Sequence, residues 1–499
     1  MHETPAGAYG RSRSTDSDRP ARIIGGLLLA GLVGTLATLA QAQPAPVPTG
    51  ADEHRDPLTS ALAPTPGGLG PEAVARRAVR TSHSLGSKQA ELRAAAAEVD
   101  QALVGFFPIV STSFSYSRLS PVENQLDLGI SIPGMDMSSF SFPVINDSYS
   151  WDTQVVVPFS DYLLRLTHAY VAAEQGAESK RLAAQAEALR VAADAKVAFF
   201  NWLRAKANRA VAALSVEQIR EHIKDANATL AVGLLSRADL LRLESQLAQA
   251  EQLATSLGRF EAVAEKQLRL SIHIEPSEAM TVGIDVLATP RPTLLEAKSE
   301  PELEQLALEQ RAELRALDAG KRALEQVDWL AFAGYFPRVD GFLTLSYANP
   351  NQRYFPQDAV WNSTWVLGVK ASWTVNDTFR AIGANKESSS NVAALEEQRL
   401  GLEDGIAISV AAAYAEAENA RSSIRAAERA EVAAEEGLGV RRNLFRAGKA
   451  TSTDMVDAES ELTRARLQRV NAHVDLLVAQ AKLAYAVGVD ALPQQLTEQ

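Results

Sequence analysis

The chain has 499 residues, a formal net charge of −12 and no cysteine. The acidic balance argues against nucleic acid as a partner. The absence of cysteine excludes disulfides, thiolate metal ligands, a cysteine nucleophile and a lipid-modified N-terminal cysteine. The seven histidines are scattered without HExxH spacing, and there is no GxSxG motif and no phosphate-binding glycine-rich loop. We therefore expect a protein that is neither an enzyme nor a lipoprotein and that holds no metal or other cofactor.

The N-terminus has the pattern of a secretory signal peptide. Residues 1–22 are polar and contain four arginines, residues 23–40 are mainly apolar, and Ala40-Gln41-Ala42 offers a small-x-small cleavage site. We predict a signal peptide at 1–42, followed by a flexible leader at 43–70 that is rich in Pro and Gly. Because the apolar run approaches the length that spans a bilayer, an uncleaved membrane anchor is the alternative.

The first repeat is predicted over residues 71–300. A helical pattern begins at Pro71, and its period changes to two for a β-hairpin over 109–158. The stretch 162–231 contains no proline and predicts one helix, about 105 Å long at about 1.5 Å per residue. A turn at Gly233, a returning helix and an irregular segment at 271–300 complete the repeat.

The second repeat, over residues 301–490, has the same order of elements. It begins with a helix, continues with a β-hairpin over 338–375 and a proline-free helix over 378–447, and then turns at Gly448 into a returning helix. Residues 491–499 form a C-terminal tail. The hairpin loops differ in length between the repeats, whereas the long helices do not, as expected if the helices span a fixed physical distance.

The two turns share a short motif. Gly233 is followed by Ser236 and Asp239, and Gly448 is followed by Thr451 and Asp454. Glycine stops a helix, and a hydroxyl residue with an acid three positions later caps the next one. Each half of the chain is therefore expected to end in a tight helical hairpin.

The predicted strands have one aromatic or apolar face and one polar face. Four of the six tryptophans belong to these segments: Trp151, Trp361, Trp365 and Trp373. This alternation is typical of a lipid-facing wall around an aqueous interior; the alternative is an ordinary sheet packed on a core. Because the smallest such barrels have about eight strands, four strands need further copies of the chain.

These features resemble the TolC-like outer membrane efflux protein family over about residues 71–490. The resemblance rests on Phe107-Pro108 and Phe336-Pro337 before the hairpins, on the helix start Leu306-Ala307-x-x-x-Arg311-Ala312-Glu313-Leu314, and on the two Gly-x-x-Ser/Thr-x-x-Asp turns. It implies a mainly α fold with a membrane β-barrel portion. Duplicated long-helix hairpins would form a periplasmic α-barrel, and each chain of a homotrimer would give four strands to a 12-stranded barrel.

The resemblance also implies a function. The protein would be the outer membrane exit duct of a tripartite efflux or type I secretion system, in contact with outer membrane lipid and extending into the periplasm. Its partners would be a periplasmic adaptor and an inner-membrane efflux transporter. The alternatives are a periplasmic adaptor and a coiled-coil scaffold with no channel. An adaptor needs a lipoyl-like β-domain and usually has one hairpin, and a scaffold does not account for the strands.

The family places its gate and its adaptor-docking face at the helix turns. The tips that this implies here are Gly233, Ser236, Gly448, Lys449 and Thr451. In the family, aspartates after the second turn ring the constriction, and Asp454 and Asp457 match them; Asp239 matches an acid position after the first turn. The alternative role for each aspartate is a helix cap or a first-turn acid, which we favour for Asp239 alone.

A basic latch residue of the family's archetype corresponds to Ala450 in this chain. Lys449 or Arg242 would have to replace it in holding the closed state. The four tryptophans would form the aromatic belt at the membrane.

Overall fold

The computed structural model describes residues 63–121, 125–126, 140–141, 145–233, 235–288 and 293–489. The expected signal peptide at 1–42, most of the leader and the tail at 491–499 lie outside these ranges. Within them, no helix combines the length and the apolar character needed to cross a bilayer.

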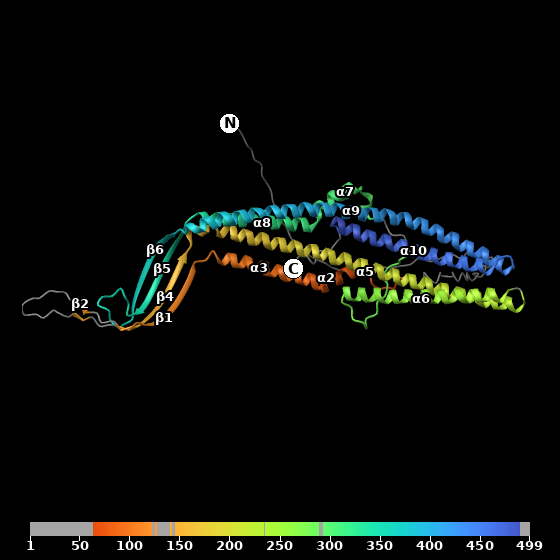
Figure 1. Ribbon diagram of the computed structural model, residues 1–499, viewed down its shortest axis with the longest axis horizontal. Helices are drawn as coiled ribbons and strands as arrows, with labels where there is room; N and C mark the ends of the chain where they lie inside the picture. Colours follow the sequence, from red (N-terminus) through yellow and green to blue (C-terminus); the bar gives the residue numbers. More distant parts are fainter. Residues whose placement is uncertain are drawn as a thin grey trace, which may run out of the picture. The chain divides into compact units, whose positions relative to one another are not determined.

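Long helices make up most of the described chain (Figure 1). The helices of the first repeat are α2 (Pro71–Thr81), α3 (His83–Val104), α4 (Phe159–Leu164), α5 (Leu166–Ala231) and α6 (Arg237–Ser271). Those of the second are α7 (Glu300–Gln310), α8 (Ala312–Phe332), α9 (Val375–Arg446) and α10 (Ser452–Val487), with short 3-10 turns η1 (Leu294–Ala297) and η2 (Ala333–Tyr335). Helix α5 pairs with α6, and α9 pairs with α10.

The long helices pack through small residues at alternating steps of three and four. On α9 the buried positions include Val410, Ala413, Ala417, Ala420 and Ile424. That spacing keeps one narrow seam facing a neighbouring helix over many turns. The seams continue into a larger core, where Phe199 and Leu203 of α5 meet Val474 of α10 and Ile272 after α6.

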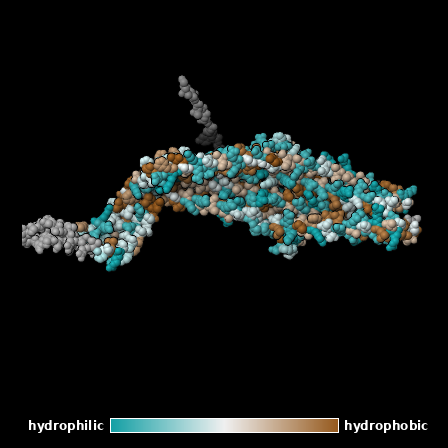
Figure 2. Space-filling view, in the orientation of Figure 1, coloured by the Kyte–Doolittle hydropathy of each residue, from teal (hydrophilic) through white to brown (hydrophobic). Residues whose placement is uncertain are grey.

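One antiparallel sheet contains the four long strands. Its strands are β1 (Ile109–Arg118), β4 (Asp147–Val157), β5 (Arg338–Asn349) and β6 (Asn362–Ser372), in the order β1-β4-β5-β6. Sequence periodicity predicted two hairpins, and the structure joins them through the β4–β5 pair, where Trp151 lies opposite Tyr347. A separate two-stranded ribbon, β2 (Gln125–Leu126) and β3 (Phe140–Ser141), lies in the first hairpin loop. Figure 2 shows hydrophobic side chains over the strands and near their junction with the long helices.

The first helix of each repeat is interrupted, and the prediction of unbroken helices is wrong at these points. A single residue with extended backbone separates α2 from α3 at Ser82 and α7 from α8 at Arg311. Ser82 accepts a hydrogen bond from the Leu85 amide and so caps α3. The guanidinium of Arg311 donates to the carbonyls of Tyr485 and Ala486, at 3.1 and 3.2 Å, at the end of α10. Residue Arg165 likewise separates α4 from α5, within the stretch predicted as one helix.

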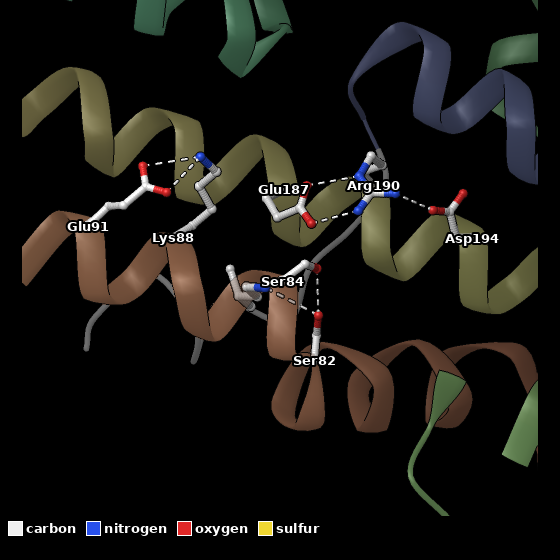
Figure 3. A network of polar contacts seen from close by, with 8 residues as sticks. Ser82, Ser84, Lys88, Glu91, Glu187, Arg190 and Asp194 are labelled. Carbon is white, nitrogen blue, oxygen red and sulfur yellow. Dashed lines mark hydrogen bonds and ion pairs between the residues drawn. The ribbon is translucent and has the colours of Figure 1, made fainter. Parts of the chain in front are cut away.

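Charged side chains cover the helices next to the Ser82 break (Figure 3). Arg190 of α5 pairs with Glu187 at 2.6 Å and with Asp194 at 2.7 Å. Lys88 of α3 pairs with Glu91 at 3.0 Å. Such exposed pairs within a helix contribute about 0.3–0.5 kcal/mol each, so the apolar seams are the main source of stability here.

The structure thus confirms the expected fold class. The described chain is mainly helical, with a small four-stranded antiparallel sheet and two long helical hairpins.

Candidate functional site

Both helix turns depend on a glycine with left-handed backbone. The φ angle is 77° at Gly233 and 69° at Gly448. After α9, the amide of Lys449 donates to the carbonyl of Leu444 at 2.8 Å, which closes the end of the helix. An L side chain at either glycine would be strained, because residues with a Cβ rarely adopt positive φ.

Each returning helix starts with a reciprocal capping box. The Ser236 hydroxyl accepts from the Asp239 amide at 3.2 Å, and the Thr451 hydroxyl accepts from the Asp454 amide at 3.2 Å. Each aspartate in turn accepts a hydrogen bond from the cap residue's amide. A hydroxyl cap of this kind stabilises a helix by about 0.5–2 kcal/mol. The capping role therefore describes both Asp239 and Asp454.

The capping hydrogen bonds also set the charge state of these acids. The Ser236 hydroxyl, followed by that of Ser452, holds the pKa of Asp239 below its usual value. The Thr451 hydroxyl, followed by its amide, does the same for the pKa of Asp454. Both carboxylates are therefore ionised at neutral pH, and the turns present negative charge.

The two turns are joined directly by Asp239. The buried hydroxyl of Ser452, at the start of α10, donates to Asp239 Oδ1. Asp239 therefore connects the two hairpins as well as capping α6. Asp457 is exposed, and its carboxylate makes no hydrogen bond or ion pair to the described residues, so it is available to solvent or to another chain.

One basic residue near the turns joins the two hairpins. Neither the Lys449 side chain nor the Arg242 side chain forms a hydrogen bond or ion pair with the described residues. Instead, Arg446 at the end of α9 donates to Asp225 of α5 at 3.0 Å. This pair bridges the two hairpins a few residues before the turns, and sequence reasoning missed it.

A buried charged cluster lies further along the same contact between hairpins. His222 Nε2 of α5 is 2.5 Å from Glu459 Oε1 of α10, and the Glu459 side chain is almost fully buried. Arg442 of α9 is 3.4 Å from the same imidazole nitrogen and 4.0 Å from the same carboxylate oxygen. Glu459 aligns with Glu244 in the repeated turn motif, which was the only sequence feature that could have indicated this cluster.

The tryptophans lie on a largely uncovered face of the sheet. Trp151, Trp365 and Trp373 are exposed, with Trp365 at 65%, while Trp361 stacks on Tyr347 with ring centroids 4.9 Å apart. Trp361 and Trp373 flank β6 and do not lie within it. Leucine and valine side chains continue this exposed face at Leu345, Leu367 and Val369. The short helix α4 packs on one end of this face, where Phe159 lies against Gly341. The exposed side chains listed above leave the rest of the face uncovered, which argues against a sheet that covers an ordinary core.

Long paired helices with capped turns, joined to a sheet with a largely uncovered aromatic face, are typical of outer membrane proteins that extend away from the bilayer. The chain belongs to the outer membrane efflux protein family, whose model matches residues 74–272 and 303–489. No curated protein sequence matches the chain. The adaptor and scaffold alternatives have no support from the family match, and the chain is an outer membrane efflux protein.

Solved structures of outer membrane proteins have the same fold. The chain is similar to CusC, with a TM-score of 0.70 at 16% identity over 84% of this chain and 92% of that chain. It is similar to VceC from Vibrio cholerae, with a TM-score of 0.68 at 17% identity over 84% and 96% of the two chains. It is also similar to the MtrE channel of Neisseria gonorrhoeae in its open state, with a TM-score of 0.68 at 17% identity over 84% of this chain and 89% of that chain.

Proposed function

We propose that this chain is the passive exit duct of a tripartite efflux or type I secretion system. Three copies would complete a 12-stranded wall in the outer membrane and a helical tunnel below it. An inner-membrane transporter would supply the energy, and a periplasmic adaptor would dock at the helix turns. The duct itself would carry out no chemistry. The observation that carries this proposal is a four-stranded sheet with two free edges and a largely uncovered aromatic face.

The free edges support assembly from several copies. Strands β1 and β6 each have one hydrogen-bonded neighbour in the sheet. Free edges promote uncontrolled pairing, and a membrane cannot satisfy their backbone groups. Pairing β6 of one copy with β1 of the next would remove every free edge once the ring closes.

The outer surface of α6 gives independent support for a neighbouring copy. Leu253, Phe260, Val263 and Leu270 are exposed along this helix at intervals of seven, three and seven residues. That spacing places them in one stripe. A stripe of this kind requires a helix partner, and the neighbouring protomer would supply it.

The turns are the proposed gate and docking face. Gly233, Ser236, Gly448, Lys449 and Thr451 would form the tips that meet the adaptor. Around a threefold axis, Asp454 and Asp457 would place six carboxylates near a narrow opening, which would attract cations and repel anions. The Arg446–Asp225 pair and the cluster of His222, Arg442 and Glu459 would hold the hairpins together in place of the latch missing at Ala450.

Export through the signal peptide at 1–42, without lipid modification, would bring the protein to the outer membrane. There the belt of Trp151, Trp361, Trp365 and Trp373 would contact lipid.

Assembly and insertion test this proposal together. Purified protein in detergent is expected to have the size of a trimer; a monomer in the soluble periplasmic fraction would refute the duct. Trp365→Lys should impair insertion by about 2–4 kcal/mol if the residue lies near the bilayer midplane. Ser346→Lys, on the opposite face of the sheet, is the matched control and should insert normally, because that face would line water.

A further inference from the structure

One face of α10 carries a column of buried polar residues. Glu459, Arg466 and His473 follow one another at intervals of seven residues and are 3%, 8% and 1% exposed. Positions seven apart lie on the same side of a paired helix. The column therefore points into the space that α10 shares with α9 and α5, its packing partners.

The first two members of the column are balanced by opposite charges. Glu459 contacts His222 and Arg442, as described above. Arg466 lies 3.8 Å from Glu431 of α9 and donates to Gln218 of α5 at 3.4 Å. Glu431 also accepts from Arg469 at 2.8 Å. The charges of these pairs oppose one another, while Glu459 Oε2 and Arg466 Nε have no hydrogen-bond partner among the described residues.

His473, the most buried member, has only a half-exposed acid to compensate a charge on it. Neither ring nitrogen has a hydrogen-bond partner among the described residues. That acid is Glu428 of α9, whose carboxylate lies 3.5 Å from Nε2 and whose side chain is half exposed. Arg469 approaches from one turn earlier on α10, and the carbonyl of Ala288 approaches from the segment before η1.

Helix α5 adds no free charge beside this imidazole. Its Arg204 is paired with Asp475 at 2.7 Å, and its Asn208 donates to Asn471 at 3.1 Å. A buried imidazole with unsatisfied nitrogens costs stability that an apolar residue would not.

The repeat shows that the fold does not require this column. Aligned on Gly233 and Gly448, the corresponding positions of α6 are Glu244, Glu251 and Gly258. Glu244 and Glu251 are exposed, and Gly258 has no side chain. The helical hairpin therefore forms without a buried column, and the column is specific to α10.

We propose that His473 makes the contact between α9 and α10 sensitive to acid: a proton on this imidazole places a charge in a buried site and loosens the two helices. The consequence for the channel rests on the proposed function, because the turn between α9 and α10 would form the mouth. Acid would then favour opening of the mouth.

The direction of the pH effect follows from the linkage between proton binding and helix packing. Burial, followed by the nearby charge of Arg469, lowers the pKa of His473, while Glu428 opposes this. The packed helices therefore hold the neutral imidazole, and the loosened helices bind the proton more tightly. The packed arrangement keeps its full stability above the ordinary imidazole pKa of about 6.5 and loses stability as the pH falls below it.

The absence of cysteine allows a direct test. Ala472→Cys places a single buried thiol next to His473, on the side of α10 that packs on α9, in the full-length protein. Its alkylation rate would be measured at about pH 7.5 and about pH 5.5, on either side of the ordinary imidazole pKa. Dividing each rate by that of the same thiol in a His473→Leu background removes the chemical effect of pH on the thiol. The normalised rate should rise by about threefold or more in acid.

Two further variants make the test specific. Glu428→Gln removes the acid that favours the charged imidazole, so it should enlarge the acid response. His83→Leu changes an exposed histidine on α3 and should leave the response unchanged. If His473→Leu does not fold, the alkylation rates of Ala472→Cys alone and with Glu428→Gln, compared at each pH, still give the sign of the acid response.

Equal acceleration with and without His473, or no acceleration in acid, would overturn the proposal. So would a Glu428→Gln variant with a smaller acid response. The measurement needs neither a partner nor conduction, so its failure is distinguishable from failure of the duct itself, which the trimer size tests separately.

Discussion

Helices α6 and α10 occupy equivalent places in the two repeats but lie in different environments. They have 35 and 36 residues, and each starts with a hydroxyl-aspartate capping box. Yet α6 has four buried residues, whereas α10 has eighteen. Helix α6 packs mainly on α5, and α10 packs on α9, α5, α6 and α7. The shared local sequence builds the same hairpin twice, and the neighbours decide which hairpin becomes part of the core.

Side chains at matching positions show how the sequence accommodates this difference. Val470, Val474 and Leu476 of α10 are buried. With the two glycines aligned, they correspond to Thr255, Arg259 and Glu261 of α6. The second apolar face of α10 has thus no counterpart on α6, where the same positions are polar.

The largest effect is expected when a charge is placed at one of these matched positions of α10 and α6. Val474→Asp buries an unpaired carboxylate and should cost about 3–5 kcal/mol of unfolding free energy. Arg259→Asp, at the equivalent exposed position of α6, should cost within about 0.5 kcal/mol. Thermal unfolding followed by circular dichroism compares the two. Equal losses would show that the two hairpins are not packed as differently as their burial indicates.

Removing a matched leucine from each helix should test the same difference in burial between α10 and α6. Leu462 of α10 is fully buried, and the matching Leu247 of α6 is half-buried. Leu462→Ala should cost about 2–5 kcal/mol, because it removes packed atoms and leaves a cavity. Leu247→Ala should cost less, since solvent already reaches that site. Chemical denaturation midpoints provide the measurement, and a larger loss at Leu247 would contradict the interpretation.

Substitutions of the two capping acids should differ in their effect on stability, but by less than the core substitutions. Asp239→Ala removes a cap and the contact to Ser452, whereas Asp454→Ala removes a cap alone. The first variant should therefore lower the melting temperature more. Because both acids have a lowered pKa, their stabilisation is present above the usual aspartate pKa of about 3.9 and is lost as the pH falls through the folded value. Melting temperatures between neutral and acid pH would show this loss in the wild type and a weaker one in each variant.

The smallest structural effect should accompany a functional one. Asp454→Asn with Asp457→Asn keeps the size of both side chains and removes charge at the proposed mouth. Conductance in planar bilayers should then show weaker selectivity for cations and weaker block by multivalent cations. Asp239→Asn is the control on the other hairpin and should change selectivity less. Unchanged selectivity in the double variant would reduce these acids to local roles.

Much of the fold could be predicted from the sequence because its signals are local. The strand alternation, the positions of the turns and the capping boxes each depend on residues within a few positions of one another. The family resemblance came from the order of these local features. The breaks at Ser82 and Arg311 were missed because neither residue is a helix breaker by type. Arg311 leaves the helical path where its side chain reaches the end of α10.

The candidate site could be predicted only in part. The turns and their aspartates were found from the repeated motif, and Asp239 is indeed a cap. The Arg446–Asp225 pair, the cluster at Glu459 and the burial of His473 were not found, because each joins residues from helices distant in the chain. In the sequence, His473 is one of seven scattered histidines.

The sequence by itself determined the duplicated order of helix, hairpin, long helix and turn, since nearest neighbours in the chain fix these elements. Only the tertiary structure decided that β4 pairs with β5, that α10 is enclosed while α6 is exposed, and that one face of α10 buries charge. The physical reason is that burial and pairing depend on partners from the other repeat, and local periodicity shows that a helix has an apolar face without showing which helix will cover it.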